Sequence, residues 1–149
     1  MENIQATIVN PLIGNKFPLP SYSTDGSAGI DLRACIDTSL IIRPNATELI
    51  GSGIAINIHD PNIAAMLLPR SGLGVKHGIV LGNLVGLIDS DYRKEVKIAV
   101  WNRSTEQFTI NPGERICQMI FVPIIKANFQ WVDELEDNGR DGFGSTGLS

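Results

Sequence analysis

Short runs of alternating apolar and polar residues, interrupted by glycine and proline, constrain this chain more than any other feature of its sequence. The alternation has a period of two at residues 4–8, 30–34, 54–58 and 96–101. A period of two places every second side chain on the same face of a β-strand. The 15 glycines and 8 prolines recur at intervals too short for long helices. The pattern therefore predicts many short strands.

Three further segments complete the predicted elements. Residues 63–68 form an apolar run closed by Pro69, which suits either a buried strand or one and a half helical turns; its length favours a strand. A tight turn at 111–114 precedes two more predicted strands, at 115–122 and 124–132, separated by Pro123. Only residues 71–77 suggest a helix. This spacing predicts an all-β protein, either a β-sandwich or a jelly roll, with one short helix.

Length and composition restrict the domain organisation. The chain has 149 residues and shows neither an internal repeat nor a linker between two domains. We expect one domain at residues 1–137, followed by a flexible glycine-rich tail at 138–149, because the composition of the tail offers too little apolar surface for independent packing.

Charge and cysteine usage exclude several classes of partner. The net charge is −4 and no run of Lys or Arg is present, so we expect no nucleic-acid partner. No apolar run approaches the length of a membrane span, and we expect no membrane partner. Cys35 and Cys117 each lie in an apolar run, which predicts two buried, reduced thiols, and a cytoplasmic location is the simplest account of them; a disulfide stays open.

Five stretches combine glycine with charged or hydroxyl residues. They are residues 27–32, 69–74, 82–94, 112–120 and 140–147. Each one alone has an ordinary interpretation: a solvated Asp on a strand, a loop with an N-cap serine, an Asp-rich turn, a core strand after a turn, and a disordered terminus. Each also suits a chemical role.

The chemistry of the first four stretches points to an anionic ligand. Asp31, behind a glycine, can reach the water shell of a magnesium ion. Arg70 and the following Ser and Gly open the predicted helix, whose free amides suit an anion. Asp89 follows two bulky apolar residues, which suits a general base held partly out of water. Gln118 shares a strand face with Arg115 only if a bulge lies between them.

The last stretch has a different character. Phe143 is a lone aromatic residue among glycines, which suits stacking on a flat group. The neighbouring amides, with the hydroxyls of Ser145 and Thr146, suit an anion.

Taken together and in this order, the five stretches resemble the five motifs of the homotrimeric dUTPase family. The most specific matches are residues 28–32 (AGIDL), 69–72 (PRSG), 86–92 (GLIDSDY) and 113–118 (GERICQ). The resemblance covers the chain from about residue 17 onward. It implies a homotrimeric jelly roll with three active sites shared between subunits. It also implies hydrolysis of dUTP to dUMP and pyrophosphate with Mg²⁺, which limits uracil incorporation into DNA and supplies dUMP for dTMP synthesis.

The resemblance also implies a role for each site residue. Asp89 activates the water that attacks the α-phosphorus, and Asp31 holds the metal through water. The expected ligands of the phosphates are Arg70, Ser71, Gly72 and Gln118. The expected nucleoside-binding residues are Asn83, Leu87, Ile88, Tyr92 and Lys97, with Tyr92 under the deoxyribose. The expected contributions of the tail are Phe143 over the base and Arg140, Gly144, Ser145 and Thr146 on the terminal phosphates.

Two departures from the family pattern, and two rival functions, stay open at this point. Lys94 stands where the family usually has glycine, and it would be strained if the position requires a positive φ. Asn138 stands where the family places its tail arginine, while Arg140 is only three residues before Phe143. The rivals are a dCTP deaminase-like enzyme on the same fold and a nucleotide-sensing binding protein without catalysis.

Overall fold

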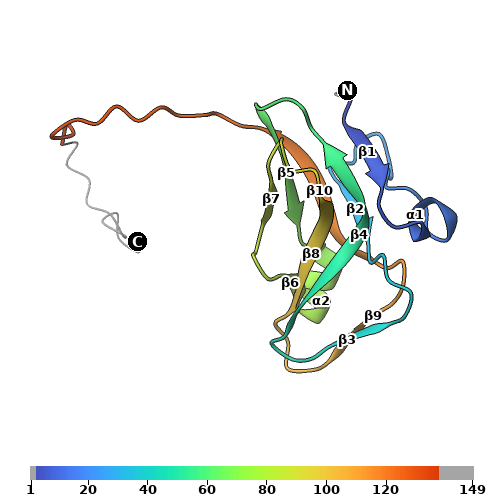
Figure 1. Cartoon of the computed structure of the whole chain (residues 1–149). Coiled ribbons are helices and arrows are strands. Elements are labelled where there is room, and N and C mark those ends of the chain that lie inside the picture. The colour runs from blue at the N-terminus through green and yellow to red at the C-terminus, as the bar shows by residue number, and fades with distance from the viewer. Residues whose placement is uncertain (1–2, 138–149) are drawn as a thin grey trace.

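A β-sandwich of two four-stranded antiparallel sheets forms the body of the molecule in this computed structural model, which describes residues 3–137 (Figure 1). The strand orders are β1-β4-β8-β6 and β2-β10-β5-β7, and β3 pairs with β9 in a separate two-stranded sheet. In chain order the elements are β1 (Gln5–Ile8), α1 (Leu12–Asn15), β2 (Ile30–Arg33), β3 (Leu40–Ile42), β4 (Thr47–Asn57), β5 (Ile63–Leu68), α2 (Ser71–His77), β6 (Ile79–Leu81), β7 (Gly86–Ile88), β8 (Glu95–Asn102), β9 (Phe108–Ile110) and β10 (Arg115–Pro123).

The core lies between the two four-stranded sheets and follows the alternation of the sequence. In β8 every second residue is buried, including Val96, Ile98 and Val100. The facing sheet contributes Leu32 from β2 and Cys117 from β10, both fully buried. The apolar faces of both sheets are thus removed from water against each other, which is the main source of stability in such a sandwich.

Most of the predicted elements are present. The predicted strands at 4–8, 30–34, 54–58 and 96–101 correspond to β1, β2, the second half of β4, and β8. The apolar run at 63–68 is the strand β5, and the predicted helix at 71–77 is α2. Cys35 and Cys117 are both free and buried, as expected. The predicted all-β jelly-roll class is confirmed. α2 is its predicted short helix, and the unpredicted α1 is a four-residue segment with non-helical φ and ψ at Ile13 and Gly14.

The predicted strand at 124–132 is wrong for the single chain. Beyond Pro123 the described residues carry no strand, and the chain leaves the sandwich as an extended arm (Figure 1). The backbone amide of Ile124 donates to the carbonyl of Asn62, and the arm then diverges from the body. An alternating sequence becomes a strand only when a neighbouring strand accepts its backbone hydrogen bonds.

The segment between Gly82 and Gly86 does not form a β-hairpin. β6 pairs with β8, whereas β7 pairs with β5 in the other sheet. The segment therefore crosses from one sheet to the other. Its central residue Leu84 has φ of 63°, a left-handed conformation that turns the chain sharply. Within residues 3–137 no helix has the length and apolar character needed to cross a bilayer.

Candidate active site

A pocket of about 270 Å³ lies where the edge strands of the two sheets, β6 and β7, come together. Side chains from β4, β5, β6 and β8 form its apolar floor, among them Leu49, Leu67, Leu81 and Val96. The polar lining residues lie at the rim. The structure brings six of the predicted site residues together here: Asn83, Leu87, Ile88, Asp89, Tyr92 and Lys97.

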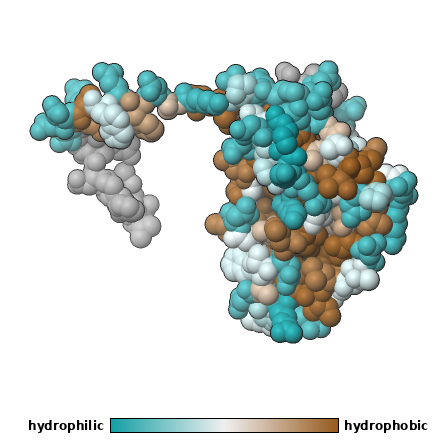
Figure 2. Space-filling view, viewed as in Figure 1, coloured by the Kyte–Doolittle hydropathy of each residue, from teal (hydrophilic) through white to brown (hydrophobic). Residues whose placement is uncertain are grey.

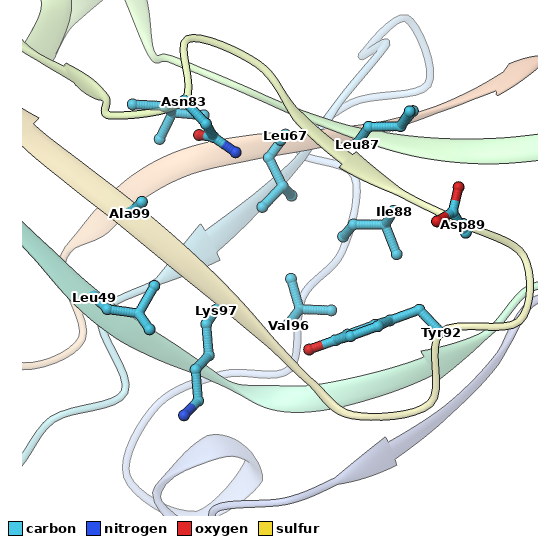
Figure 3. A pocket seen from close by; sticks show the side chains of 12 residues that line it. Leu49, Leu67, Asn83, Leu87, Ile88, Asp89, Tyr92, Val96, Lys97 and Ala99 are labelled. Atoms are coloured by element: carbon cyan, nitrogen blue, oxygen red, sulfur yellow. The ribbon is translucent and has the colours of Figure 1, made fainter.

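The rim residues approach the pocket from different sides (Figure 3). Asn83 and Asp89 lie at opposite ends of the segment that carries β7, and the ring of Tyr92 lies beside Val96 and Ile88. Asp89 is exposed in the single chain. The expectation that it is held partly out of water is therefore not met by one chain alone, because Ile88 is buried in the core and Leu87 is itself exposed, so neither covers the carboxylate.

Gly82 and Gly86 serve packing inside the protein. A Cβ at Gly86 would lie 3.0 Å from the Cβ of Leu67, and one at Gly82 would lie 2.9 Å from the Cγ2 of Thr47. Contacts this close leave no room for a side chain. The two glycines thus allow β7 to lie directly against β5 and the crossing segment to lie against β4, which fixes one wall of the pocket.

Tyr92 is held by its own turn. Its backbone amide donates to the carbonyl of Asp89 at 3.1 Å, and its hydroxyl donates to the carbonyl of Glu95 at 3.0 Å. The phenol is therefore anchored at its polar end, with its ring against the pocket. Lys94, in the same turn, does not have a positive φ. The turn therefore accommodates Lys94 in place of the family's usual glycine without the strain of a positive φ.

A second group of predicted site residues gathers along β10, the strand between β2 and β5. Gln118 is the cross-strand partner of Asp31 in β2 on one side and of Leu68 in β5 on the other. Its Nε2 donates to the carbonyl of Pro69 at 3.1 Å, which ties the start of α2 to β10. Ser71 and Gly72 then open α2 and are exposed.

Asp31 binds two arginines at once. Its Oδ1 lies 2.9 Å from the Nε of Arg70, and its Oδ2 lies 3.0 Å from the Nη1 of Arg115. The Nη1 of Arg70 also donates to the backbone carbonyl of Arg115 at 3.1 Å. Two guanidinium groups around one carboxylate leave the group with a net positive charge, which suits a polyphosphate.

Sequence reasoning did not assign a role to Arg115, because the residue reaches this group through a β-bulge. The register of β10 against β2 shifts between Arg115 and Cys117. Ile116 and Cys117 are consecutive buried residues, and the side chains of Arg115 and Gln118 point outward on either side of them. The bulge that would place both residues on one face is therefore present. A buried pair within an alternating strand was the available signal.

The carboxylates of the described residues fit a magnesium ion held mainly by water and substrate. No group of three or more His, Cys, Asp and Glu side chains capable of holding a metal occurs within residues 3–137. Magnesium keeps several waters and is commonly bound by one or two carboxylates together with substrate phosphates. Both oxygens of Asp31 accept from arginines, and each has a remaining lone pair for a metal-bound water.

The pocket beside β7 is separate, within one chain, from the cationic group, which we define as Asp31, Arg70, Arg115, Gln118 and the start of α2. Among the described residues that line the pocket, none comes from the group formed by Asp31, Arg70, Ser71, Gly72 and Gln118. The remaining predicted ligands lie outside the described residues: Arg140, Phe143, Gly144, Ser145 and Thr146.

Known proteins resemble this chain over its full length. Residues 15–147 match the dUTPase family model. Deoxyuridine 5'-triphosphate nucleotidohydrolases of Psychromonas ingrahamii and Enterobacter sp. are 58% and 56% identical over 149 residues, which is 99% of this chain and 99% and 98% of those proteins.

Solved structures confirm the fold. A mutant dUTPase of Staphylococcus bacteriophage 80alpha with dUpNHpp matches with a TM-score of 0.83 at 21% identity, covering 99% of this chain and all of that one. A mutant dUTPase of S. aureus phage phi11, described with a structural Mg(II) ion, matches with a TM-score of 0.77 at 19% identity, covering 91% and 99%. The match of the family model to almost the entire chain, with relatives above 50% identity, means that this chain belongs to the dUTPase family.

Proposed function

We propose that this protein hydrolyses dUTP to dUMP and pyrophosphate. The observation that carries the proposal is the pocket beside β7, which has an acidic residue, Asp89, and an anchored aromatic residue, Tyr92, at its rim. Full-length relatives named as deoxyuridine 5'-triphosphate nucleotidohydrolases support the same activity.

The pocket suits a nucleoside because two free strand edges face it. β7 is the outer strand of its sheet, so its backbone groups on the side away from β5 are available to a ligand. Uracil presents an acceptor-donor-acceptor edge that backbone amides and carbonyls can match. Asn83 and the backbone of Leu87 and Ile88 read that edge, Tyr92 packs under the deoxyribose, and Lys97 lies beside the nucleoside.

Asp89 acts as the general base. Its carboxylate takes a proton from a water molecule, whose oxygen forms a bond to the α-phosphorus. The bond from the α-phosphorus to the bridging oxygen of the β-phosphate breaks, and that oxygen leaves with the electron pair as part of pyrophosphate. Exposure of Asp89 in a single chain is compatible with this role, since closing the site over substrate would exclude bulk water.

The cationic group holds the phosphates. Arg70, Gln118 and the first amides of α2 at Ser71 and Gly72 offer donors on one surface. Mg²⁺, when bound, neutralises charge that develops on the phosphate oxygens. Asp31 holds a water of that ion. From the tail, Phe143 covers the base, while Arg140, Gly144, Ser145 and Thr146 hold the terminal phosphates.

A homotrimer with shared active sites would unite the two separate groups. The arm at 124–137 supports association, because its apolar side chains lie away from the sandwich body (Figure 2). Ile125 is 96% exposed, Trp131 89% and Leu135 86%. Side chains of this kind are normally buried, and a neighbouring subunit would bury them.

A cytoplasmic location and the absence of nucleic-acid and membrane partners complete the proposal. Two free, buried cysteines are typical of a reducing compartment. The net charge of −4 disfavours binding to a nucleic-acid backbone.

A release assay across nucleotides tests the activity. The purified protein is incubated with Mg²⁺ and with dUTP, dCTP, dTTP or UTP, and pyrophosphate and ammonia are both measured. We expect pyrophosphate from dUTP far in excess of the other three. Ammonia from dCTP would identify a deaminase, and binding of dUTP without any pyrophosphate would identify a nucleotide sensor; either result would overturn the proposal.

A further inference from the structure

Arg115 makes two contacts in the cationic group, one with Asp31 and one with Arg70. Its side chain pairs with Oδ2 of Asp31 at 3.0 Å, and its backbone carbonyl accepts from Nη1 of Arg70 at 3.1 Å. Arg70 is meanwhile held at Nε by the other oxygen of Asp31. The three residues thus form a closed set of contacts between β2, the start of α2 and β10.

The pairing of Arg115 with Asp31 determines how Asp31 can hold Arg70. A carboxylate facing a single guanidinium commonly binds it through both oxygens, which occupies two N–H groups on one side of the guanidinium. Here Oδ2 is taken by Arg115, so Asp31 holds Arg70 through Oδ1 alone. Of the five N–H donors of Arg70, those of Nη2 and the second of Nη1 make no hydrogen bond or ion pair with the described residues.

Charge and exposure agree with this arrangement. Asp31 with one arginine would be neutral, whereas Asp31 with two arginines carries a net charge of +1, which an anionic ligand can neutralise. The side chain of Arg70 is 27% exposed and that of Asp31 is 22% exposed, while that of Arg115 reaches 46%. Arg70 is therefore the more buried of the two arginines, and Arg115 lies on the solvent side of Asp31.

We propose that Arg115 is a positioning residue for phosphate binding, which acts through Asp31 to fix the guanidinium of Arg70 with its Nη groups free for the substrate. The β-bulge in β10 is the feature that makes this possible, since it turns Arg115 toward Asp31. This inference rests on the proposed function, because Arg70 is a phosphate ligand only if the substrate is a nucleoside triphosphate.

The test compares Arg115→Gln with Arg43→Gln. Arg43 is exposed and lies beyond the end of β3, so its substitution removes the same charge without touching Asp31. We expect Arg115→Gln to weaken pyrophosphate binding in calorimetry, and to lower kcat/KM for dUTP, by about tenfold. Inhibition by deoxyuridine, which lacks phosphates, should not change. Arg115→Lys should recover part of the loss, since Lys keeps the charge but not the planar geometry.

A double-mutant cycle with Asp31→Asn separates positioning from direct contact. If Arg115 acts through Asp31, its substitution should cost nothing further in the Asp31→Asn background. Full additivity of the two losses would show that Arg115 binds phosphate itself and would overturn the inference. Equal losses in Arg43→Gln, or a parallel loss of deoxyuridine inhibition, would overturn it as well.

Failure of the inference differs from failure of the proposed function. The inference alone is wrong if the wild-type protein hydrolyses dUTP and Arg115→Gln changes neither kcat/KM nor pyrophosphate binding. A wild-type protein without dUTP hydrolysis sinks the proposed function. In that case the role of Arg115 at an anion site is still decided by pyrophosphate binding to the wild type and its variants.

Discussion

At the scale of single residues, we propose that Asp89, at the pocket rim, is the group that accepts the proton. Replacing its carboxylate with an amide in Asp89→Asn keeps the size of the side chain and removes the proton acceptor. We expect turnover of dUTP to fall about 10²-fold or more, with binding of dUpNHpp nearly unchanged. Single-turnover kinetics and calorimetry measure the two quantities. A variant with near-normal turnover would remove Asp89 from this role.

We propose that Tyr92 determines the choice of sugar. Its hydroxyl donates to the carbonyl of Glu95, which fixes the ring at the pocket rim. In the proposed binding mode the ring occupies the space that a 2′-hydroxyl would need. We expect Tyr92→Ala to narrow the difference in kcat/KM between dUTP and UTP, and Tyr92→Phe, which keeps the ring, to preserve most of it. An equal fall for both substrates in Tyr92→Ala would place ribose exclusion elsewhere.

Among the elements, β4 contains a bulge whose geometry requires a glycine. Its register against β8 shifts between Gly51 and Ala55, and Gly53 within this bulge has φ of +77°. A Cβ at Gly53 would lie 2.6 Å from both the Sγ of Cys35 and the Cγ1 of Ile13. The amide of Gly53 also donates to the carboxylate of Glu95 at 3.0 Å. The bulge is thus built around an absent side chain.

Gly53→Ala should therefore destabilise the fold. Left-handed strain and crowding together predict a loss of about 2–4 kcal/mol in the free energy of unfolding, and a Tm lower by roughly 5–15 °C. Gly26→Ala is the matched control, since its Cβ would meet nothing within 4 Å and its φ is not positive. Thermal unfolding of both variants checks the prediction. Equal melting temperatures for the two variants would contradict it.

At the scale of the whole molecule, we predict that the tail at 138–149, which carries the fifth motif, is a lid. Its only bulky apolar residues are Phe143 and Leu148, so its ordering would depend on ligand contacts. A chain ending at Asp137 should keep its oligomeric state and melting temperature and turn over dUTP at least roughly tenfold slower, or about 1.4 kcal/mol in the barrier. Full activity of this shortened chain would contradict a lid.

We propose that the arm at 124–137, unlike the tail, holds the subunits of the proposed trimer together. A chain ending at Pro123 lacks the exposed apolar residues of 124–137, and we expect it to lose the trimer, because these side chains find no partner on their own sandwich. Light scattering after size exclusion measures the mass of both shortened chains. A trimer that persists without the arm would show that the sandwich faces alone hold the subunits together.

Local pattern was sufficient for most of the fold and for the residue types of the site. The period of two predicted β1, β2, the second half of β4 and β8, because alternation is a property of adjacent residues. Residues 71–77 were the one segment predicted to be helical, and α2 has these bounds, although its N-cap is Arg70 and not a serine. The motifs around Asp89 and Gln118 named the side chains that the structure places at the pocket and along β10.

Only the tertiary structure decided which strands pair, and with them the geometry of the site. The segment after β6 joins the two sheets, because β6 pairs with β8 in one sheet and β7 pairs with β5 in the other. Residues 124–132 alternate like a strand but have no strand partner in one chain. Arg115 reaches Asp31 because a β-bulge shifts the register of β10 against β2 between Arg115 and Cys117. Register and pairing depend on backbone partners that are distant in sequence, which no local pattern specifies.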